Sequence, residues 1–201
     1  MRAIAGPRVT LRAIEAPDFR VWRDAKVRNQ DWVGPWEPET DPGVADPSVD
    51  KGAFRSRCAT WSRQRHLGTA YALGIFLRDG SLAGEIHLSN VLRGPFQSGM
   101  IGYWVDQGHA GQGLAPEAVV LLLQFAFEDL GLHRVEISIV PRNKASLRVI
   151  EKLGLREEGL AVDYLKIQGI WEDHVRHAMT AVEWDERGMA MLESHVHQVV
   201  R

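Results

Sequence analysis

The chain has 201 residues, of which 45% are hydrophobic and 25% charged, and its formal net charge is −2. These values are typical of one soluble globular domain and give no overall attraction to nucleic acid or to an anionic membrane. Cys58 is the single cysteine, so no internal disulfide can form, and no apolar run approaches the ~20 residues of a membrane span. A cytoplasmic protein is therefore expected.

The N-terminal quarter predicts one strand and two helices around a loop. The strand is expected over residues 8–14, and the helices over residues 17–28 and 50–65. Residues 31–49 are rich in Pro, Asp and Gly, which predicts a mobile connector. Three tryptophans crowd into the N-terminal segment and indicate a lip or lid more than part of a core: Trp22, Trp32 and Trp36.

The centre of the chain predicts antiparallel strands. Apolar and β-branched runs indicate strands over residues 69–77, 82–88 and 97–106. The sequence Arg-Asp-Gly-Ser at residues 78–81 is typical of a hairpin turn between the first two strands. An almost wholly apolar helix follows over residues 117–130, and its composition predicts burial against the sheet.

The C-terminal part completes a mixed sheet. Its pattern predicts a strand, a short helix and a final hairpin, over residues 134–140, 144–153, 156–167 and 170–183. Residues 1–184 are thus expected to form a single α/β (α+β) domain. Residues 185–201 are expected to be a tail that is either a short helix or disordered.

A glycine-rich turn at residues 108–118 joins a strand to the apolar helix. Glycines let the backbone approach a ligand closely, and a helix start presents unpaired N–H groups that suit a phosphate or diphosphate. The alternative is a mere connector. A P-loop is set aside because Leu114 and Ala115 stand where it needs Lys and Ser or Thr. A dinucleotide-binding fold is set aside because the preceding strands are predicted antiparallel.

Three sequence blocks carry a family resemblance. They are Gly-Gln-Gly-Leu-Ala-Pro-Glu-Ala at 111–118, Pro-Arg-Asn-Lys-Ala-Ser at 141–146 and Glu-Lys-Leu-Gly-Leu at 151–155. In this order and spacing they resemble the GCN5-related N-acetyltransferase superfamily. Residues 89–94 and 163–174 further resemble its branch that acetylates the N-termini of ribosomal proteins, the RimJ/RimL type. The similarity covers roughly residues 8–184.

The resemblance implies a fold and a co-substrate. The fold would be a mostly antiparallel sheet of about seven strands that splays at its centre, with acetyl-coenzyme A in the gap and its diphosphate on the glycine turn. The positions implied to bind this co-substrate are Tyr103, Trp104, Val105, Ala110, Gly111, Gln112, Gly113, Leu114, Ala115 and Asn143. Ala110 departs from the basic or amide residue usual in the family, so weaker binding at most is expected.

The resemblance also implies how protons move. The family's acidic tyrosine falls on Ile150, which has no proton to give, and RimL-like members use a serine at the position of Ser146 to protonate the departing thiolate. Asp163 matches an acidic residue that accepts the amine proton through a water. Glu85, with His87 two residues later, is the alternative base. Each carboxylate can also be read as an ordinary solvated strand residue.

The remaining candidate residues are expected to have structural roles only, and no metal site is expected. Cys58 could in principle carry an acetyl group, but its helical setting favours packing. Asn143 is expected to cap the helix that follows it. The eight histidines form no metal pattern, so no metal is expected.

The function implied by the resemblance is transfer of an acetyl group from acetyl-coenzyme A directly to a primary amine. The acceptor expected first is the N-terminal amine of a protein of ribosomal type. The alternatives are a small amine such as an aminoglycoside and, from another class, a non-catalytic acyl-coenzyme A sensor. Neither a nucleic-acid nor a membrane partner is expected, and the protein is expected to be a monomer or a homodimer.

Overall fold

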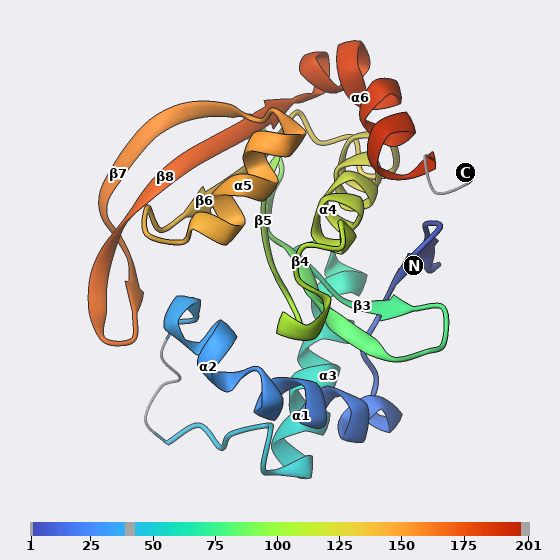
Figure 1. Cartoon of the computed structure of the whole chain (residues 1–201), viewed down its shortest axis with the longest axis vertical. Coiled ribbons are helices and arrows are strands. Elements are labelled where there is room, and N and C mark those ends of the chain that lie inside the picture. The colour runs from blue at the N-terminus through green and yellow to red at the C-terminus, as the bar shows by residue number, and fades with distance from the viewer. Residues whose placement is uncertain (1, 39–42, 198–201) are drawn as a thin grey trace.

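A computed structural model describes residues 2–38 and 43–197. It contains an eight-stranded sheet in the order β1-β2-β3-β4-β5-β6-β8-β7 (Figure 1). The strands are β1 (Ile4–Ala5), β2 (Val9–Arg12), β3 (Tyr71–Leu77), β4 (Leu82–Leu92), β5 (Ser98–Val105), β6 (Arg134–Ile139), β7 (Arg156–Ile167) and β8 (Ile170–Thr180). The mixed α/β fold is confirmed. The strand beyond the seven predicted is β1, a two-residue edge piece.

The sheet opens between its two central strands. β5 and β6 are the one parallel pair, and they are in register only from Ser98–Arg134 to Met100–Glu136. Beyond Met100 the strands diverge, whereas β4 stays paired with β5 as far as Val105. The predicted splay is therefore present, and it leaves one edge of β5 without a strand partner.

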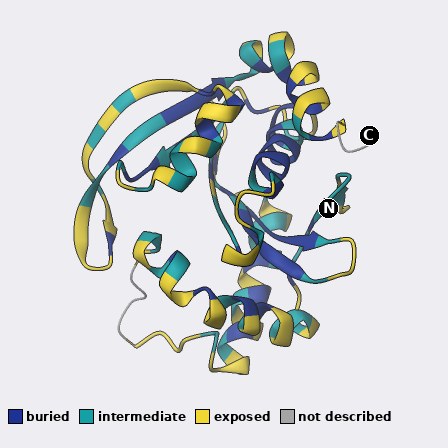
Figure 2. Ribbon diagram, viewed as in Figure 1, coloured by how far each residue is buried: buried dark blue, intermediate teal, exposed yellow. Residues whose placement is uncertain are grey.

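Helices cover both faces of the sheet because its central strands are apolar on both sides. Along β3, Leu73 and Ile75 join the core beneath α4 (Leu114–Gln124), while Ala72 and Phe76 join a second cluster beneath α1 (Phe19–Arg28) and α3 (Lys51–Leu67). In Figure 2 α4 is buried almost all round, as its composition predicts. The expected helix over 117–130 begins three residues earlier, at Leu114, and ends in a π-helical turn, Phe125–Asp129.

The connector over residues 31–49 is partly structured, which corrects the expectation of a mobile loop. Gln30–Val33 forms α2, and Gly34–Trp36 forms a 3₁₀ turn. The Gln168 amide, in the turn between β7 and β8, donates to the carbonyls of Gly34 (3.0 Å) and Glu37 (3.1 Å). These bonds connect the 3₁₀ turn that follows α2 to the final hairpin. Residues 39–42 of the connector lie outside the described residues.

The C-terminal segment is helical up to residue 195. Thr180 and Glu183 cap α6 (Ala181–His195) reciprocally, and this pair of residues is a helix-start signal in the sequence. The strand that the sequence predicted up to residue 183 therefore ends at Thr180. Trp184 and Met191 pack into the main core. The boundary expected after residue 184 thus falls inside a helix that belongs to the domain. Among the described residues, no helix is long and apolar enough to cross a bilayer.

Candidate active site

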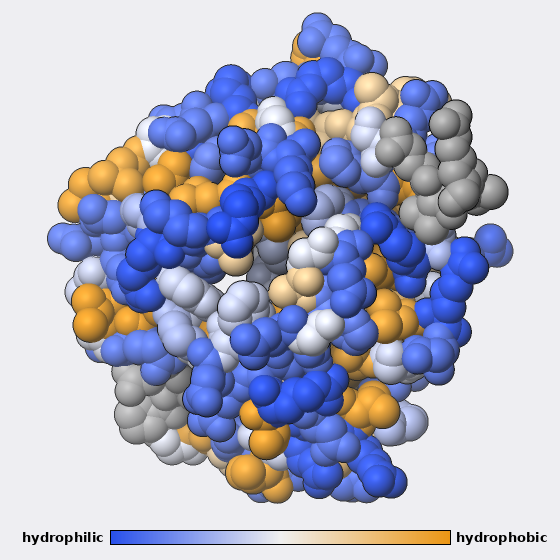
Figure 3. Space-filling model, viewed as in Figure 1, coloured by the Kyte–Doolittle hydropathy of each residue, from blue (hydrophilic) through white to orange (hydrophobic). Residues whose placement is uncertain are grey.

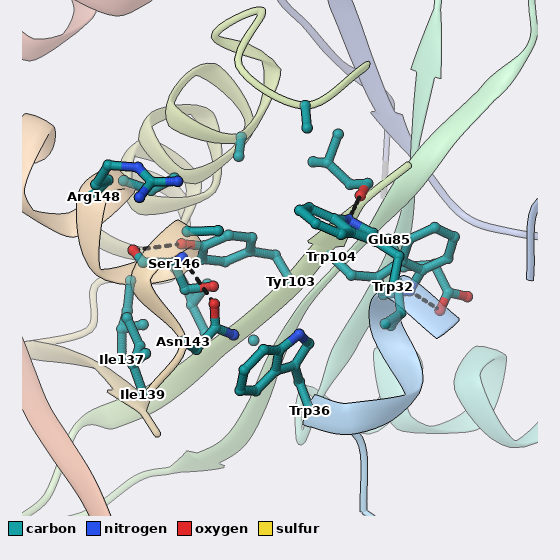
Figure 4. Close-up of a pocket in the computed structure, with 18 of the residues that line it drawn as sticks. Trp32, Trp36, Glu85, Tyr103, Trp104, Ile137, Ile139, Asn143, Ser146 and Arg148 are labelled. Carbon is teal, nitrogen blue, oxygen red and sulfur yellow. Dashed lines mark hydrogen bonds between the residues drawn. The ribbon is translucent and has the colours of Figure 1, made fainter. Parts of the chain in front are cut away.

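A cavity of about 690 Å³ occupies the opening of the sheet. Its walls come from β5, β6, the glycine turn, the start of α5 (Lys144–Leu153) and the segment containing α2. Figure 3 shows this face of the molecule as a mostly hydrophilic surface that is hollowed near its centre. In Figure 4, Trp32 and Trp36 lie on one side of the cavity and Asn143 and Ser146 on the other, with Tyr103 between them. Trp32 and Trp36 therefore form the predicted lip, whereas Trp22 is fully buried in a core cluster, which corrects the expectation for that residue.

The glycine turn presents backbone donors to this cavity. Gly111 and Gly113 both have positive φ (78° and 81°), and Gly113 begins α4 without any side-chain cap. Within residues 110–115 of the turn, two N–H groups have local acceptors, those of Ala110 and Gln112. The N–H groups of Gly111, Gly113, Leu114 and Ala115 have no acceptor among the described residues, and all four residues line the cavity. Such a set of converging donors at a helix start suits an anion.

Arg8 and Glu117 hold this turn from behind. The Arg8 Nε donates to Glu117 Oε2 (2.5 Å), and its terminal nitrogens donate to the carbonyls of Gln112 (2.9 Å) and Gly113 (3.2 Å). Glu117 is fully buried, and its Oε1 accepts the N–H groups of Arg8 (2.9 Å) and Val9 (3.1 Å). Because these carbonyls turn toward Arg8, the free N–H groups are left to face the cavity. Gln112 itself does not line the cavity.

The open edge of β5 lies along the same cavity. Asp106 donates its N–H to Ala83 on the β4 side (2.8 Å), and donors alternate sides along a strand, so the backbone groups of Tyr103 and Val105 face the gap. The Val105 carbonyl accepts the indole N–H of Trp32 (3.1 Å). The backbone of Trp104 faces β4 instead, and its side chain is the part that lines the cavity.

Asn143 and Ser146 stand at the start of α5. The Asn143 Oδ1 accepts the Ser146 N–H (3.1 Å), so Asn143 is the helix cap that its position indicated. This bond uses only the backbone of Ser146. The Tyr103 hydroxyl reaches the Ser146 carbonyl (3.5 Å), and burial raises the pKa of Tyr103. Ile150 is buried in the core, and Ser146 is the hydroxyl-bearing residue of this helix that lines the cavity.

Glu85 is a buried carboxylate (2% exposed) at the other wall. The indole N–H groups of Trp22 (2.6 Å) and Trp104 (2.9 Å) donate to its two oxygens. Burial acts to raise the pKa of Glu85, but His87, Arg57 and the Trp104 hydrogen bond outweigh it and lower the pKa to about 2. Glu85 is therefore an anion over the whole physiological range.

Asp163 does not reach the cavity. It is exposed on β7 at a break in the pairing with β8, with a positive φ of 48°, and its N–H donates to Asp173 (2.9 Å). The structure thus brings Glu85, Ser146 and the glycine turn around one space and leaves Asp163 outside it. Cys58 is buried in the α3 packing cluster, where burial raises the pKa of its thiol. In the described part of the chain, no cluster of three or more His, Cys, Asp or Glu could hold a metal ion.

Sequence reasoning missed Arg8 and Glu117, and it missed that Trp22 contacts Glu85. Glu117 could have been noticed as the one acidic residue in the first turn of an otherwise apolar helix. Its partner, however, is 109 residues away, and no local pattern indicates the pairing. Trp22 lies on α1, and only the packing of α1 against the sheet brings its indole to Glu85.

Comparison with known proteins decides the family. The model described as "Acetyltransferase (GNAT) domain" matches residues 8–156. The chain belongs to the GNAT acetyltransferase family. It is 33% identical over 170 residues to an enzyme of Escherichia coli (strain K12) named [Ribosomal protein uS5]-alanine N-acetyltransferase, covering 83% of this chain and 86% of that one.

Solved structures agree with this assignment. A structure of Mycobacterium smegmatis RimJ in complex with CoA-disulfide has a TM-score of 0.85 at 33% identity, covering 96% of this GNAT chain and 91% of the other. A ribosomal-protein-S5-alanine acetyltransferase from Vibrio fischeri has a TM-score of 0.82 at 26% identity, covering 92% and 99%. The chain is thus a GNAT acetyltransferase similar to RimJ, and the predicted superfamily and branch are confirmed.

Proposed function

We propose that this enzyme transfers the acetyl group of acetyl-coenzyme A to the N-terminal α-amine of a protein, with a ribosomal protein as the acceptor. The observation that carries the proposal is the row of free N–H groups at the glycine turn, which continues into an unpaired strand edge. The first suits a diphosphate, and the second suits an extended pantetheine arm that adds to β5 as a strand would. The RimJ structure with a coenzyme A disulfide, and the name of the Escherichia coli relative, support the donor and the acceptor class.

The charges lining the cavity are divided in a way that supports this order of binding. The acidic residues Asp31, Glu37 and Glu85 lie on the side formed by α2 and β4, together with Arg57. The cations of α5 lie on the opposite side. An anionic donor is favoured along α5, and a cationic amine is favoured beside α2. The acceptor would enter between the Trp32 and Trp36 lip and the turn at Gln168 that holds it.

The reaction does not require a strong general base. A free N-terminal amine has a pKa of about 8, so part of it is already neutral at physiological pH. When the nitrogen bonds to the thioester carbon it becomes positively charged, and the ionised Glu85 stabilises that charge. The nitrogen releases its proton to solvent water as the carbon–sulfur bond breaks. The N–H groups of Tyr103 and Val105 face the gap, where they stabilise the oxyanion. Ser146 returns a proton to the sulfur. Binding both substrates together supplies much of the remaining rate.

Peptide acetylation tests the proposal. Release of free coenzyme A is measured with peptides that carry each free N-terminal residue, and with an N-blocked peptide, a polyamine and an aminoglycoside as controls. We expect turnover only with free N-termini, and we expect the product to gain one acetyl group at the α-amine by mass spectrometry. Turnover confined to the small amines would overturn the acceptor class. Tight binding of acetyl-coenzyme A without turnover of any acceptor would indicate a sensor instead.

Substituting Ser146 tests the proton donor. Ser146→Ala is expected to lower kcat about 10- to 100-fold, below or at the low end of general-acid effects, because a thiolate with a pKa of about 8.5 leaves fairly readily. The thermal midpoint should not change, because the cap uses the Ser146 backbone N–H and not its hydroxyl. Ser146→Thr is the matched control that keeps a hydroxyl and should retain most of the activity. An unchanged kcat in Ser146→Ala would remove the hydroxyl from the mechanism.

A further inference from the structure

Three cations of α5 share one face of the helix. Lys144, Arg148 and Lys152 are each four residues apart, which places them in a row with roughly 6 Å between successive positions along the axis. All three are exposed, and all three line the cavity. Figure 4 shows Arg148 extending from α5 beside Ser146.

The charges of this row are not compensated by the rest of the described chain. None of the three side chains forms an ion pair or a hydrogen bond with a described residue, whereas nearby Arg142 is paired with Glu172. Arg187, near the end of α5, donates to the carbonyls of Leu153 and Gly154. A row of free cations on a cavity wall attracts an anion that is larger than the glycine turn alone accommodates.

The row begins beside the reacting end of the cavity, and Arg148 and Lys152 lie one and two turns further along the helix than Lys144. Lys144 adjoins Asn143, and Ser146 marks the reacting end beside Tyr103. Lys152 lies two turns further along the helix. Burial lowers the pKa of His195, and the charges of Arg8 and Lys152 add to this effect. Because the His195 carbonyl accepts from Arg8 (3.2 Å), Lys152 lies within electrostatic range of the Arg8–Glu117 ion pair behind the glycine turn.

We propose that Arg148 and Lys152 form a phosphomonoester subsite that binds the 3′-phosphate on the ribose of coenzyme A. The inference rests on the proposed function, because it assumes a coenzyme A thioester as the donor. The turn N–H groups suffice for the diphosphate, which leaves the two side chains for the third phosphate. A phosphomonoester carries a charge of about −1.5 to −2 at neutral pH, and two flexible cations at a solvent-exposed mouth match it. The subsite discriminates coenzyme A from its 3′-dephospho form.

Calorimetry with coenzyme A and with 3′-dephospho-coenzyme A tests the subsite without any acceptor. The wild-type protein is expected to bind coenzyme A at least about tenfold more tightly than the dephospho form. In Arg148→Gln/Lys152→Gln the ratio should fall to about twofold or less. The loss should be in affinity for coenzyme A alone, with dephospho-coenzyme A bound as before. The charge-matched control, Arg63→Gln/Lys166→Gln, removes exposed cations that do not line the cavity and should keep the wild-type ratio.

Equal affinity of the wild type for both ligands would overturn the subsite, as would a double variant that weakens both ligands by the same factor. These outcomes are separate from failure of the proposed function. Full selectivity for coenzyme A with no turnover of any N-terminal peptide would reject the acceptor and retain the subsite. Turnover of peptides with no selectivity between the two ligands would retain the acceptor and reject the subsite. Failure of the protein to bind either ligand would reject both.

Discussion

Arg8→Met is expected to lower the free energy of unfolding by about 3 kcal/mol, because it leaves the buried Glu117 carboxylate without its cation. Glu117 keeps the N–H groups of Arg8 and Val9 on one oxygen, so the loss falls on the other oxygen, Oε2. For a chain of this size the change corresponds to a fall of roughly 6–12 °C in thermal midpoint. Thermal and urea unfolding measure it.

The same substitution should weaken binding of acetyl-coenzyme A. Without the guanidinium, the carbonyls of Gln112 and Gly113 are no longer held away from the cavity, so the turn loses its fixed row of donors. We expect the dissociation constant to rise roughly tenfold, the effect of losing about 1.4 kcal/mol. The rate at saturating donor should change much less, because Arg8 does not line the cavity and touches neither Glu85 nor Ser146.

Two further variants separate the stability effect from the binding effect. Arg8→Lys keeps a positive charge near Glu117 but cannot donate to both carbonyls, so it should retain most of the stability and lose affinity. Arg8→Met/Glu117→Gln replaces the unpaired charge with a neutral amide and should recover part of the lost stability. The proposed role of the Arg8–Glu117 pair is refuted if Arg8→Met keeps both the wild-type thermal midpoint and the wild-type affinity for acetyl-coenzyme A.

What the sequence could predict was mostly local. The glycine turn is visible because its residues are adjacent in the chain, and the Asn143 cap and the following helix are visible for the same reason. The splay of β5 from β6 came from family resemblance, and the register confirms it. α2 was missed because it is only four residues long and is held by a distant partner, the Val105 carbonyl that accepts from Trp32, while Gln168 holds the turn that follows it.

The carboxylates show why side-chain placement could not be predicted. A shift of one residue in a strand turns a side chain to the other face, and β7 breaks its pairing with β8 between Ala161 and Leu165. The sequence does not reveal that break, so Asp163 was expected in a site that it does not line. Glu85, in the part of β4 that pairs regularly with β5, was expected near the site and lines it. Its setting between two indoles, however, depends on the packing of α1.

Glu85→Gln is expected to lower kcat about 10²- to 10³-fold, because it removes the anion that faces the developing charge on the attacking nitrogen. The Michaelis constant for acetyl-coenzyme A should change little, since Glu85 is on the acceptor side. The glutamine amide has one oxygen for two indole donors, so a stability loss of about 1–3 kcal/mol is also expected. Rates are therefore compared well below the thermal midpoint. Glu157→Gln, an exposed change on β7, is the matched control.

The pH dependence distinguishes this role from that of an ordinary base. The pKa of Glu85 is about 2 in the folded protein, below its ordinary value of 4.5. Its contribution to stability is thus complete above pH 4.5 and is lost as the pH falls toward 2. The wild-type protein should lose stability over this window more steeply than Glu85→Gln, in thermal unfolding from about pH 5 down to about pH 2. The rate should rise toward the acceptor pKa of about 8, with no inflection near 4.5. A large loss of kcat in Asp163→Asn, with Glu85→Gln unaffected, would assign the role to Asp163 instead.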